Sequence, residues 1–194
     1  MSTEKPLGYL GGDIMSFGSN LARQYEYDEF IKRNINVDVY SPIMNKSIND
    51  KAAMTVEENN TAAERIVAAD VDRLWNSNFV VMCPEQSAIG SMVEVGILYG
   101  WKYLANKFYK LTPREQQEKL KFFLDQDIYC HYFDIRTNHL PEVDWRRSFS
   151  INQFLYGCIL AIEKNGDFEE LQHIFDQIED KYGHNVGGEV YNDI

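Results

Sequence analysis

The chain has 194 residues, 44% of them hydrophobic and 25% charged, which is ordinary for one soluble globular domain. Its formal net charge of -11 argues against nucleic acid or an anionic membrane as the main partner, because both are negatively charged. No apolar run is long enough to cross a bilayer, and the first residues lack the pattern of a signal peptide. These features predict a cytoplasmic protein.

Cysteines and histidines give no sign of a metal or a disulfide framework. Cys83, Cys130 and Cys158 are an odd number and far apart, so we expect reduced and mostly buried thiols. The four histidines form no HExxH or paired pattern, so we expect no metal.

The first third of the chain alternates between strand and helix patterns. Leu7–Gly12 is a short apolar run that ends in glycines, which predicts a strand that leads into a loop. Residues 19–33 fit a helix with Ser19 as its N-cap. Residues 37–42 predict a second strand ended by a proline. The polar residues 43–56 predict a loop long enough to act as a lid.

The alternation continues to the end of the chain. Residues 57–75 predict a helix, Phe79–Cys83 is the most strand-like run, and residues 90–104 return to helix. The next predictions are a helix over 112–124 with Pro113 in its first turn and a strand over 128–133. Two closing helices over 150–163 and 168–182 follow, and a tail without periodicity covers 183–194.

This order predicts an α/β fold, with a parallel sheet flanked by helices in a single domain over residues 1–194. In such sheets ligands bind beyond the carboxyl ends of the strands. The rule directs attention to residues 11–17 and 84–94.

Glu94 has two interpretations. Ser91 and Glu94 fit the S-x-x-E pattern of a capping box, in which Glu94 would only stabilise a helix end. Glu94 also shares a helix face with apolar residues, where a carboxylate needs a partner or a chemical role. A helix N-terminus would favour the ionised form that a carboxylate nucleophile requires. Nearby Gly90 would let a ligand or another helix come close.

Asp70 is a second acidic residue on an apolar stripe, four residues after Ile66 and four before Leu74. It either pairs with an arginine or caps a neighbouring element, or it points past the end of its helix into the crevice of Glu94. Two carboxylates at one sheet edge suit chemistry at a sugar anomeric carbon, where one attacks and the other helps the leaving group.

The segment after the first strand has weaker signals. Gly11 and Gly12, followed by Asp13, would let the backbone approach a ligand, although the spacing is not that of a phosphate-binding motif. Tyr9 and Phe17 could stack on a planar base, or they could belong to the core.

Together, these pieces resemble the nucleoside 2-deoxyribosyltransferase family. The resemblance rests on "YLGGD" at the start, Asp70 on a helix, "AIGSMVEVG" around Glu94 and "INQFLYG" at residues 151–157. It covers roughly residues 7–18, 62–100 and 128–160. It implies a flavodoxin-like fold, no cofactor, and a homo-oligomer with shared sites that acts on 2′-deoxynucleosides and free nucleobases.

Carried over by position, the resemblance makes Glu94 the nucleophile and Asp70 its acidic partner. The segment from Tyr9 to Asp13 would line the base pocket, and Asn152 would reach the sugar site of a neighbouring subunit. The implied reaction is exchange of the base through a covalent deoxyribosyl-Glu94 intermediate.

The chain also departs from the family pattern. Ala88, beside Ser87, stands where family members have an aspartate for the 5′ side of the sugar, and Asn78 replaces another aspartate. Residues 105–126 predict a helical insert, and a helical extension starts near 164. Two alternatives follow: a 2′-deoxynucleoside 5′-monophosphate N-glycosidase that holds phosphate with a serine, and a nucleotide-binding module without catalysis.

Overall fold

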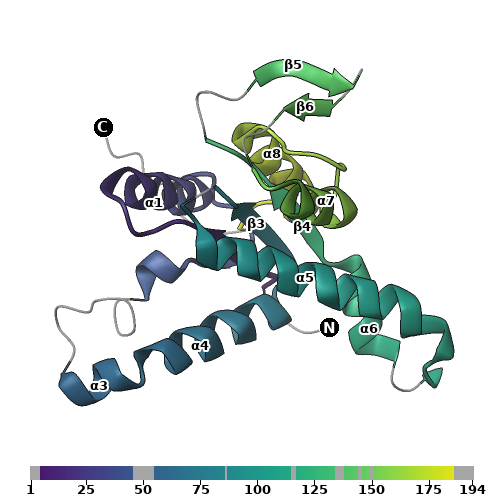
Figure 1. Cartoon of the computed structure of the whole chain (residues 1–194), viewed down its shortest axis with the longest axis horizontal. Helices are drawn as coiled ribbons and strands as arrows, with labels where there is room; N and C mark the ends of the chain where they lie inside the picture. Colours follow the sequence, from purple (N-terminus) through teal and green to yellow (C-terminus); the bar gives the residue numbers. More distant parts are fainter. Residues whose placement is uncertain are drawn as a thin grey trace.

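The computed structural model describes residues 5–45, 55–85, 87–114, 117–133, 138–143, 146–148 and 151–185. Its centre is a four-stranded parallel sheet with helices on both faces (Figure 1). The strands are β1 (Leu7–Gly12), β2 (Asp38–Tyr40), β3 (Phe79–Cys83) and β4 (Asp127–Cys130). Their order, β2-β1-β3-β4, is that of a flavodoxin-like sheet, so the expected single-domain α/β fold is confirmed.

Helices α1 (Phe17–Lys32) and α8 (Leu171–Tyr182) cover one face of the sheet. All five residues of β3 are buried, and alternate side chains point to opposite faces, as in any strand. Phe79 and Val81 therefore pack with Leu10 against α1 and α8. In this layer Phe30 of α1 meets the ring of Phe175 edge to face, with the ring centroids 5.1 Å apart.

Helices α4 (Ala62–Asn76), α5 (Ile89–Phe108) and α7 (Gln153–Ile162) cover the other face. Val80 and Met82, the alternate residues of β3, pack here with buried apolar residues of the helices. These are Leu74, Val95, Leu98, Leu155 and Ile159. The two layers complete a sandwich that leaves the carboxyl ends of the strands open for a site.

Shorter elements surround this sandwich. They are η1 (Pro42–Met44), α3 (Val56–Asn60), η2 (Tyr109–Leu111), α6 (Gln117–Asp125), β5 (Asn138–Val143) and β6 (Arg146–Ser148). β5 and β6 form an antiparallel pair apart from the main sheet, which the sequence pattern did not predict. The insert predicted at 105–126 comprises the end of α5, then η2 and α6.

Two predicted helix starts are wrong. Ser16, not Ser19, caps α1: its backbone is extended and its hydroxyl accepts a hydrogen bond from the Ser19 amide. Helix α6 begins at Gln117 rather than near Pro113, because the Gln117 side chain donates to the carbonyls of Tyr109 and Thr112. These bonds connect the first residue of α6 to η2 and to Thr112.

Two further predictions need correction. The helix predicted over 57–75 is two helices, since Thr55 and Glu58 form a capping box on α3 and the chain turns at Thr61. β4 ends at Cys130 rather than at residue 133. Most of the predicted loop at 43–56 and of the tail after 182 lies outside the described residues.

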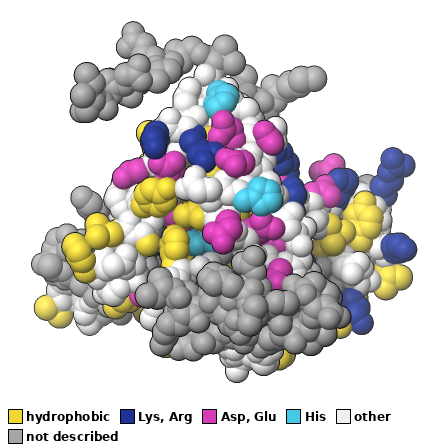
Figure 2. All heavy atoms as spheres, turned by 90° about the horizontal axis from the view of Figure 1, so that it is seen from above, with side chains coloured by type: hydrophobic (Ala, Val, Ile, Leu, Met, Phe, Trp, Pro, Cys, Tyr) yellow, Lys and Arg dark blue, Asp and Glu magenta, His cyan; other side chains and the backbone are white. Residues whose placement is uncertain are grey.

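The three cysteines are free and buried, as predicted. No helix within the described ranges is both long and apolar enough to cross a membrane. On the face shown in Figure 2, acidic and basic side chains lie intermixed around the centre, and Lys and Arg gather towards one end.

Candidate functional site

A cavity of about 560 Å³ opens at the carboxyl ends of β1 and β3. β1 pairs with β2 on one side and with β3 on the other, so the chain direction across the sheet reverses here and leaves a crevice. The cavity is lined by residues of β1 and the loop after it, of the loop after β3, of η1 and α4, and of the first turns of α5. They are Tyr9, Gly12, Asp13, Ile14, Met15, Pro42, Ile66, Asp70, Ser87, Ala88, Ile89, Gly90, Ser91 and Glu94.

Glu94 is held by a tyrosine and not by a helix cap. Helix α5 begins at Ile89 with Ala88 as its N-cap, so Ser91 lies inside the helix and Glu94 belongs to the second turn. The predicted capping box is therefore wrong. Instead, the hydroxyl of Tyr9 donates a hydrogen bond to Glu94 Oε1 over 2.6 Å, from β1 across to α5. Glu94 is part of the cavity wall.

The acidity of Glu94 also differs from the prediction. Burial raises its pKa to about 7; the hydrogen bond from Tyr9 lowers it, and the nearby charge of Asp70 raises it further. We expected the helix N-terminus to keep this carboxylate ionised. Glu94 lies beyond the first turn, where the helix dipole has little effect, and desolvation dominates. Near pH 7 the protonated and ionised forms are both populated.

Asp70 reaches the same cavity from the middle of α4, not past its end as predicted. Tyr40, at the end of β2, donates a hydrogen bond to Asp70 Oδ1 over 3.0 Å. Burial raises the pKa of Asp70, and this hydrogen bond lowers it in part. On the predicted apolar stripe Leu74 is buried, and Ile66 lines the cavity beside Asp70.

Tyr9 and Tyr40 form one aromatic pair behind the two carboxylates. Their ring centroids are 5.7 Å apart, and each hydroxyl donates to a different carboxylate. Burial and the neighbouring acids raise the pKa of Tyr9 well above its usual value. Burial raises the pKa of Tyr40 to about 12. Both phenols thus stay protonated as donors near neutral pH.

Asp13 is the third acidic side chain of the cavity. It is buried, and it accepts hydrogen bonds from the Met15 amide (2.9 Å), the Ser19 hydroxyl (2.7 Å) and the Ser87 hydroxyl (3.2 Å). Burial would raise its pKa, but these three donors, with the charge of Arg23, lower the pKa below the usual value. Asp13 is thus ionised near neutral pH, in contrast to Glu94.

The structure brings together eight of the predicted site residues and leaves three outside the cavity wall. The eight are Tyr9, Gly12, Asp13, Asp70, Ser87, Ala88, Gly90 and Glu94. Gly11 is buried in β1, and Phe17 is 82% exposed at the start of α1. Asn152 is exposed and caps α7, where its Oδ1 accepts from the amides of Phe154 and Leu155.

The two glycines of β1 make room for side chains of the protein itself. A Cβ on Gly11 would lie 2.6 Å from the sulfur of Met82, and one on Gly12 would lie 1.5 Å from Nη1 of Arg23. The side chains of Met82 and Arg23 therefore fill the space beside these glycines that we predicted for an approaching ligand. At Gly12 any other residue would displace the Arg23 guanidinium.

Tyr40 is the site residue that the sequence reasoning missed. Its place at the end of a predicted strand was a usable signal, because the carboxyl ends of parallel strands meet at one edge. The apolar wall formed by Ile14, Met15 and Pro42 gave no such signal, since it depends on how the loops fold.

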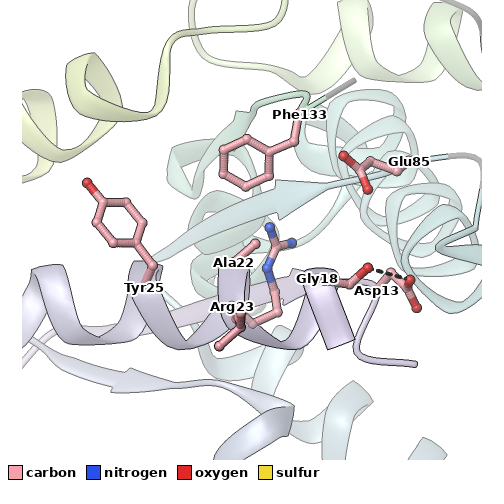
Figure 3. A pocket seen from close by; sticks show the side chains of 9 residues that line it. Asp13, Gly18, Ala22, Arg23, Tyr25, Glu85 and Phe133 are labelled. Carbon is pink, nitrogen blue, oxygen red and sulfur yellow. Dashed lines mark hydrogen bonds between the residues drawn. The ribbon is translucent and has the colours of Figure 1, made fainter. Parts of the chain in front are cut away.

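A second cavity, of about 470 Å³, lies at the same sheet edge beside α1 (Figure 3). Arg23 points into it below Phe133, and its guanidinium carbon is 5.7 Å from that ring. Below the cavity Arg23 pairs with Glu26 over 2.5 Å, and His131 Nε2 lies 2.9 Å from the same carboxylate oxygen. Asp13 lines both cavities, so it stands in the wall between them.

The cluster of Arg23, Glu26 and His131 is fully buried. Burial by itself would lower the pKa of His131, but Cys83 and Glu26 beside it raise that pKa to about 9. Arg23 also donates to the carbonyl of Gly11. Within the part of the chain that the structure describes, no group of three or more His, Cys, Asp or Glu is arranged to hold a metal ion.

Comparison with known proteins gives the fold and no activity. No family model and no curated protein sequence matches the chain. A solved structure, described as a conserved protein from Enterococcus faecalis V583, is similar with a TM-score of 0.60 and 17% sequence identity. The match covers 91% of this chain and 99% of the other. At that identity the likeness supports the flavodoxin-like α/β architecture alone.

Proposed function

We propose that the chain is a nucleoside 2-deoxyribosyltransferase that exchanges the base of a 2′-deoxynucleoside through a covalent bond to Glu94. The observation that carries the proposal is a cavity at the sheet edge whose wall holds two carboxylates, Glu94 and Asp70, each bonded to its own tyrosine. This arrangement supplies a nucleophile and a proton donor on one substrate.

In the first step the ionised Glu94 attacks C1′ of the sugar, and a C1′–O bond forms while the N-glycosidic bond breaks. The electron pair of the broken bond goes to the nitrogen of the base, which takes a proton from Asp70. In the second step the nitrogen of another base attacks C1′, Glu94 leaves as a carboxylate, and the proton of the incoming base returns to Asp70. The sugar is inverted twice and its configuration is retained.

The electrostatics of the site define the protonation state that this division of labour needs. The charge of Asp70 raises the pKa of Glu94, so the two groups titrate as a coupled pair. The reactive form of the pair holds one proton, on Asp70, and leaves Glu94 ionised. Tyr9 stabilises charge on Glu94, because its hydrogen bond lowers the pKa of that carboxylate.

The charge of the cavity favours a nucleoside over its 5′-monophosphate. None of the described residues that line the cavity is Lys, Arg or His, whereas three are acidic. These acids would repel a phosphate, and the described lining residues offer it no counter-charge. This supports the transferase over the monophosphate N-glycosidase.

Base exchange is the direct test. Incubation with thymidine and adenine should yield deoxyadenosine, detected by chromatography, and Glu94→Ala should abolish the yield. Glu64→Gln, on the exposed side of α4, is the control and should leave it unchanged. Intact-mass spectrometry after acid quenching should find one deoxyribosyl group added to the wild-type chain only.

The other outcomes identify the alternatives. Free thymine without deoxyadenosine would assign a hydrolase, and base release from a monophosphate alone would assign the N-glycosidase. Saturable nucleoside binding without turnover or adduct would assign a binding module.

A homo-oligomer with shared sites belongs to the same proposal. Asn152 is exposed and lies outside the cavity wall of its own chain, as expected for a residue that contributes to the sugar site of a neighbouring chain. Sedimentation analysis should show a species larger than one chain. Asn152→Ala should then lower exchange without changing the size of that species.

A further inference from the structure

Three hydroxyl side chains belong to the described wall of the Glu94 cavity, and they differ in what they bond to. The hydroxyl of Tyr9 donates to Glu94, and that of Ser87 donates to Asp13. Each of these two protons is therefore already used within the protein. The third hydroxyl, on Ser91, has no hydrogen-bond partner among the residues that the structure describes. Ser91 is thus the side-chain hydroxyl of this wall that is available to a ligand.

The position of Ser91 in the fold makes a free hydroxyl costly. Ser91 is 4% exposed and lies inside α5, beyond the Ala88 cap. A serine or threonine at such a place can bond to the carbonyl four residues earlier, as Thr112 does with Phe108 over 2.8 Å. Ser91 makes no such bond to a described residue. Because a buried hydroxyl without a partner costs free energy, a ligand that brings an acceptor to Ser91 is favoured.

Ser91 also stands near the proposed nucleophile. It precedes Glu94 by three residues on α5, and side chains with this spacing share a helix face, with their Cβ atoms about 5–6 Å apart. Both residues line the same cavity. The atoms next to the carbon that Glu94 attacks therefore come close to the Ser91 hydroxyl.

Two kinds of acceptor adjoin C1′ of a 2′-deoxynucleoside. One is the ring oxygen of the sugar, and the other is on the base, at O2 of a pyrimidine or N3 of a purine. A donor on the ring oxygen would oppose the oxocarbenium-like transition state, because it withdraws electrons from the positive carbon. A donor on the base stabilises the negative charge that arrives there when the N-glycosidic bond breaks. The chemistry of the reaction favours the base.

We propose that Ser91 contacts the substrate and donates a hydrogen bond to the base, at O2 of a pyrimidine or N3 of a purine. The inference rests on the proposed function, because the attack of Glu94 places C1′. Ser91 and Asp70 then act on the base in different ways. Asp70 transfers a proton to the base, whereas Ser91 keeps its proton and stabilises the base as it leaves and as it enters.

The test pairs a protein variant with a substrate variant. In 3-deaza-2′-deoxyadenosine a C–H group replaces N3, so the proposed acceptor is missing. With thymine as the incoming base, the preference in kcat/KM for 2′-deoxyadenosine over this analogue should be about tenfold greater for the wild type than for Ser91→Ala. Differences in intrinsic reactivity between the two substrates cancel in this comparison. The loss in Ser91→Ala should appear mainly in kcat, because the base gains its charge only in the transition state.

Asn106→Ala is the matched control, since it replaces an exposed polar residue near the other end of the same helix by alanine. It should keep the preference of the wild type. Urea unfolding provides a second readout. Ser91→Ala should be at least as stable as the wild type, because the hydroxyl has no described partner to lose and alanine favours a helix.

Ser91→Cys covers the case in which Ser91→Ala does not fold. Cysteine is close to serine in size, but its S–H group is only a weak donor. The preference of Ser91→Cys for 2′-deoxyadenosine over the deaza analogue should therefore also fall below that of the wild type.

Two results would overturn the proposal: an equal preference in the wild type and the folded Ser91 variants, or a less stable Ser91→Ala that exchanges bases as the wild type does. Failure of the proposed function would look different. If the wild type binds nucleosides without exchange, the same comparison of dissociation constants by calorimetry decides whether Ser91 contacts the base. If the wild type binds no nucleoside, the proposed function and this inference are both rejected.

Discussion

Two polar clusters lie at the same edge of the sheet, on opposite faces: one is buried beside α1, and the other is partly buried in the wall of the Glu94 cavity. On the α1 face Glu26 is matched by Arg23 and by His131, whose pKa is raised to about 9. On the α4 and α5 face the described hydrogen-bond partners of Glu94 and Asp70 are the uncharged hydroxyls of Tyr9 and Tyr40. The carboxylate of the α1 cluster has cationic partners, whereas the printed hydrogen bonds give the two acids of the Glu94 cluster only uncharged donors among the described residues.

The presence or absence of cationic partners distinguishes a carboxylate that stabilises the fold from one that can react. A buried carboxylate with cationic partners is held in one state, and its loss leaves unpaired charge. A buried carboxylate without them has a raised pKa and exchanges its proton near neutral pH, which costs stability and permits chemistry. The following predictions test this distinction, beginning with the largest effect.

Glu26→Gln should destabilise the protein by about 3–5 kcal/mol, because it leaves Arg23 and His131 buried without their carboxylate. Urea unfolding at pH 7 would measure the loss. Glu29→Gln is the matched control on the same helix. Its partner Lys32 is 77% exposed, and its second partner Arg33 keeps ion pairs with Asp176 and Glu179, so the loss should stay below about 1 kcal/mol. Equal losses for the two variants would show that the α1 cluster is not a special structural unit.

Glu94→Gln should stabilise the protein at pH 8 by about 2 kcal/mol and have little effect at pH 5. The folded-state pKa of about 7 exceeds the usual 4.5, so between these values the folded protein binds the proton and the unfolded chain does not. The free energy of unfolding of the wild type therefore decreases as pH rises from 4.5 to about 7. The variant has no carboxyl group at this position and does not show this decrease. Glutamine can still accept the hydrogen bond of Tyr9.

Urea unfolding of both proteins at pH 5 and pH 8 provides the comparison. A variant that is less stable than the wild type at pH 8 would mean that the charge of Glu94 is matched by a partner, and the contrast between the two clusters would fail.

Tyr9→Phe should produce the smallest effect, a shift in the pH dependence of exchange. The proposed reaction needs one proton on the Glu94–Asp70 pair, so activity of the wild type should fall as pH rises through about 7, where Glu94 gives up the last proton of the pair. Removal of the Tyr9 hydroxyl deletes the hydrogen bond that lowers the pKa of Glu94, so this fall should move to higher pH by less than about one unit. Profiles of kcat/KM against pH would show it.

Tyr40→Phe is the control for that shift, because its hydroxyl donates to Asp70 and not to Glu94. It should raise the pKa of Asp70. The part of the pH profile that reports the ionisation of Glu94 should stay closer to that of the wild type. A larger shift from Tyr40→Phe than from Tyr9→Phe would contradict the assignment of one tyrosine to each acid.

The parallel α/β architecture was predictable because its signals are local. Short apolar strands such as β3 and amphipathic helices such as α4 each carry their own periodicity, and their alternation dictates a parallel sheet. Helix ends were less predictable: the cap at Ser16 and the late start of α6 depend on individual side-chain hydrogen bonds. The rule for strand ends also brought Asp13 and Glu94 to one cavity correctly, whereas Asp70 reaches it from the middle of α4 and not past the helix end as predicted.

The sequence by itself determined which residues could meet at the sheet edge, because strand order and the period of each element follow from local patterns. Only the tertiary structure decided their chemical states. Tyr9 is 85 positions from Glu94 and Ser87 is 74 from Asp13, so no local pattern links them. Burial and hydrogen bonds across the fold raise one acid's pKa to about 7 and lower another's, because desolvation and donor number depend on packing in three dimensions.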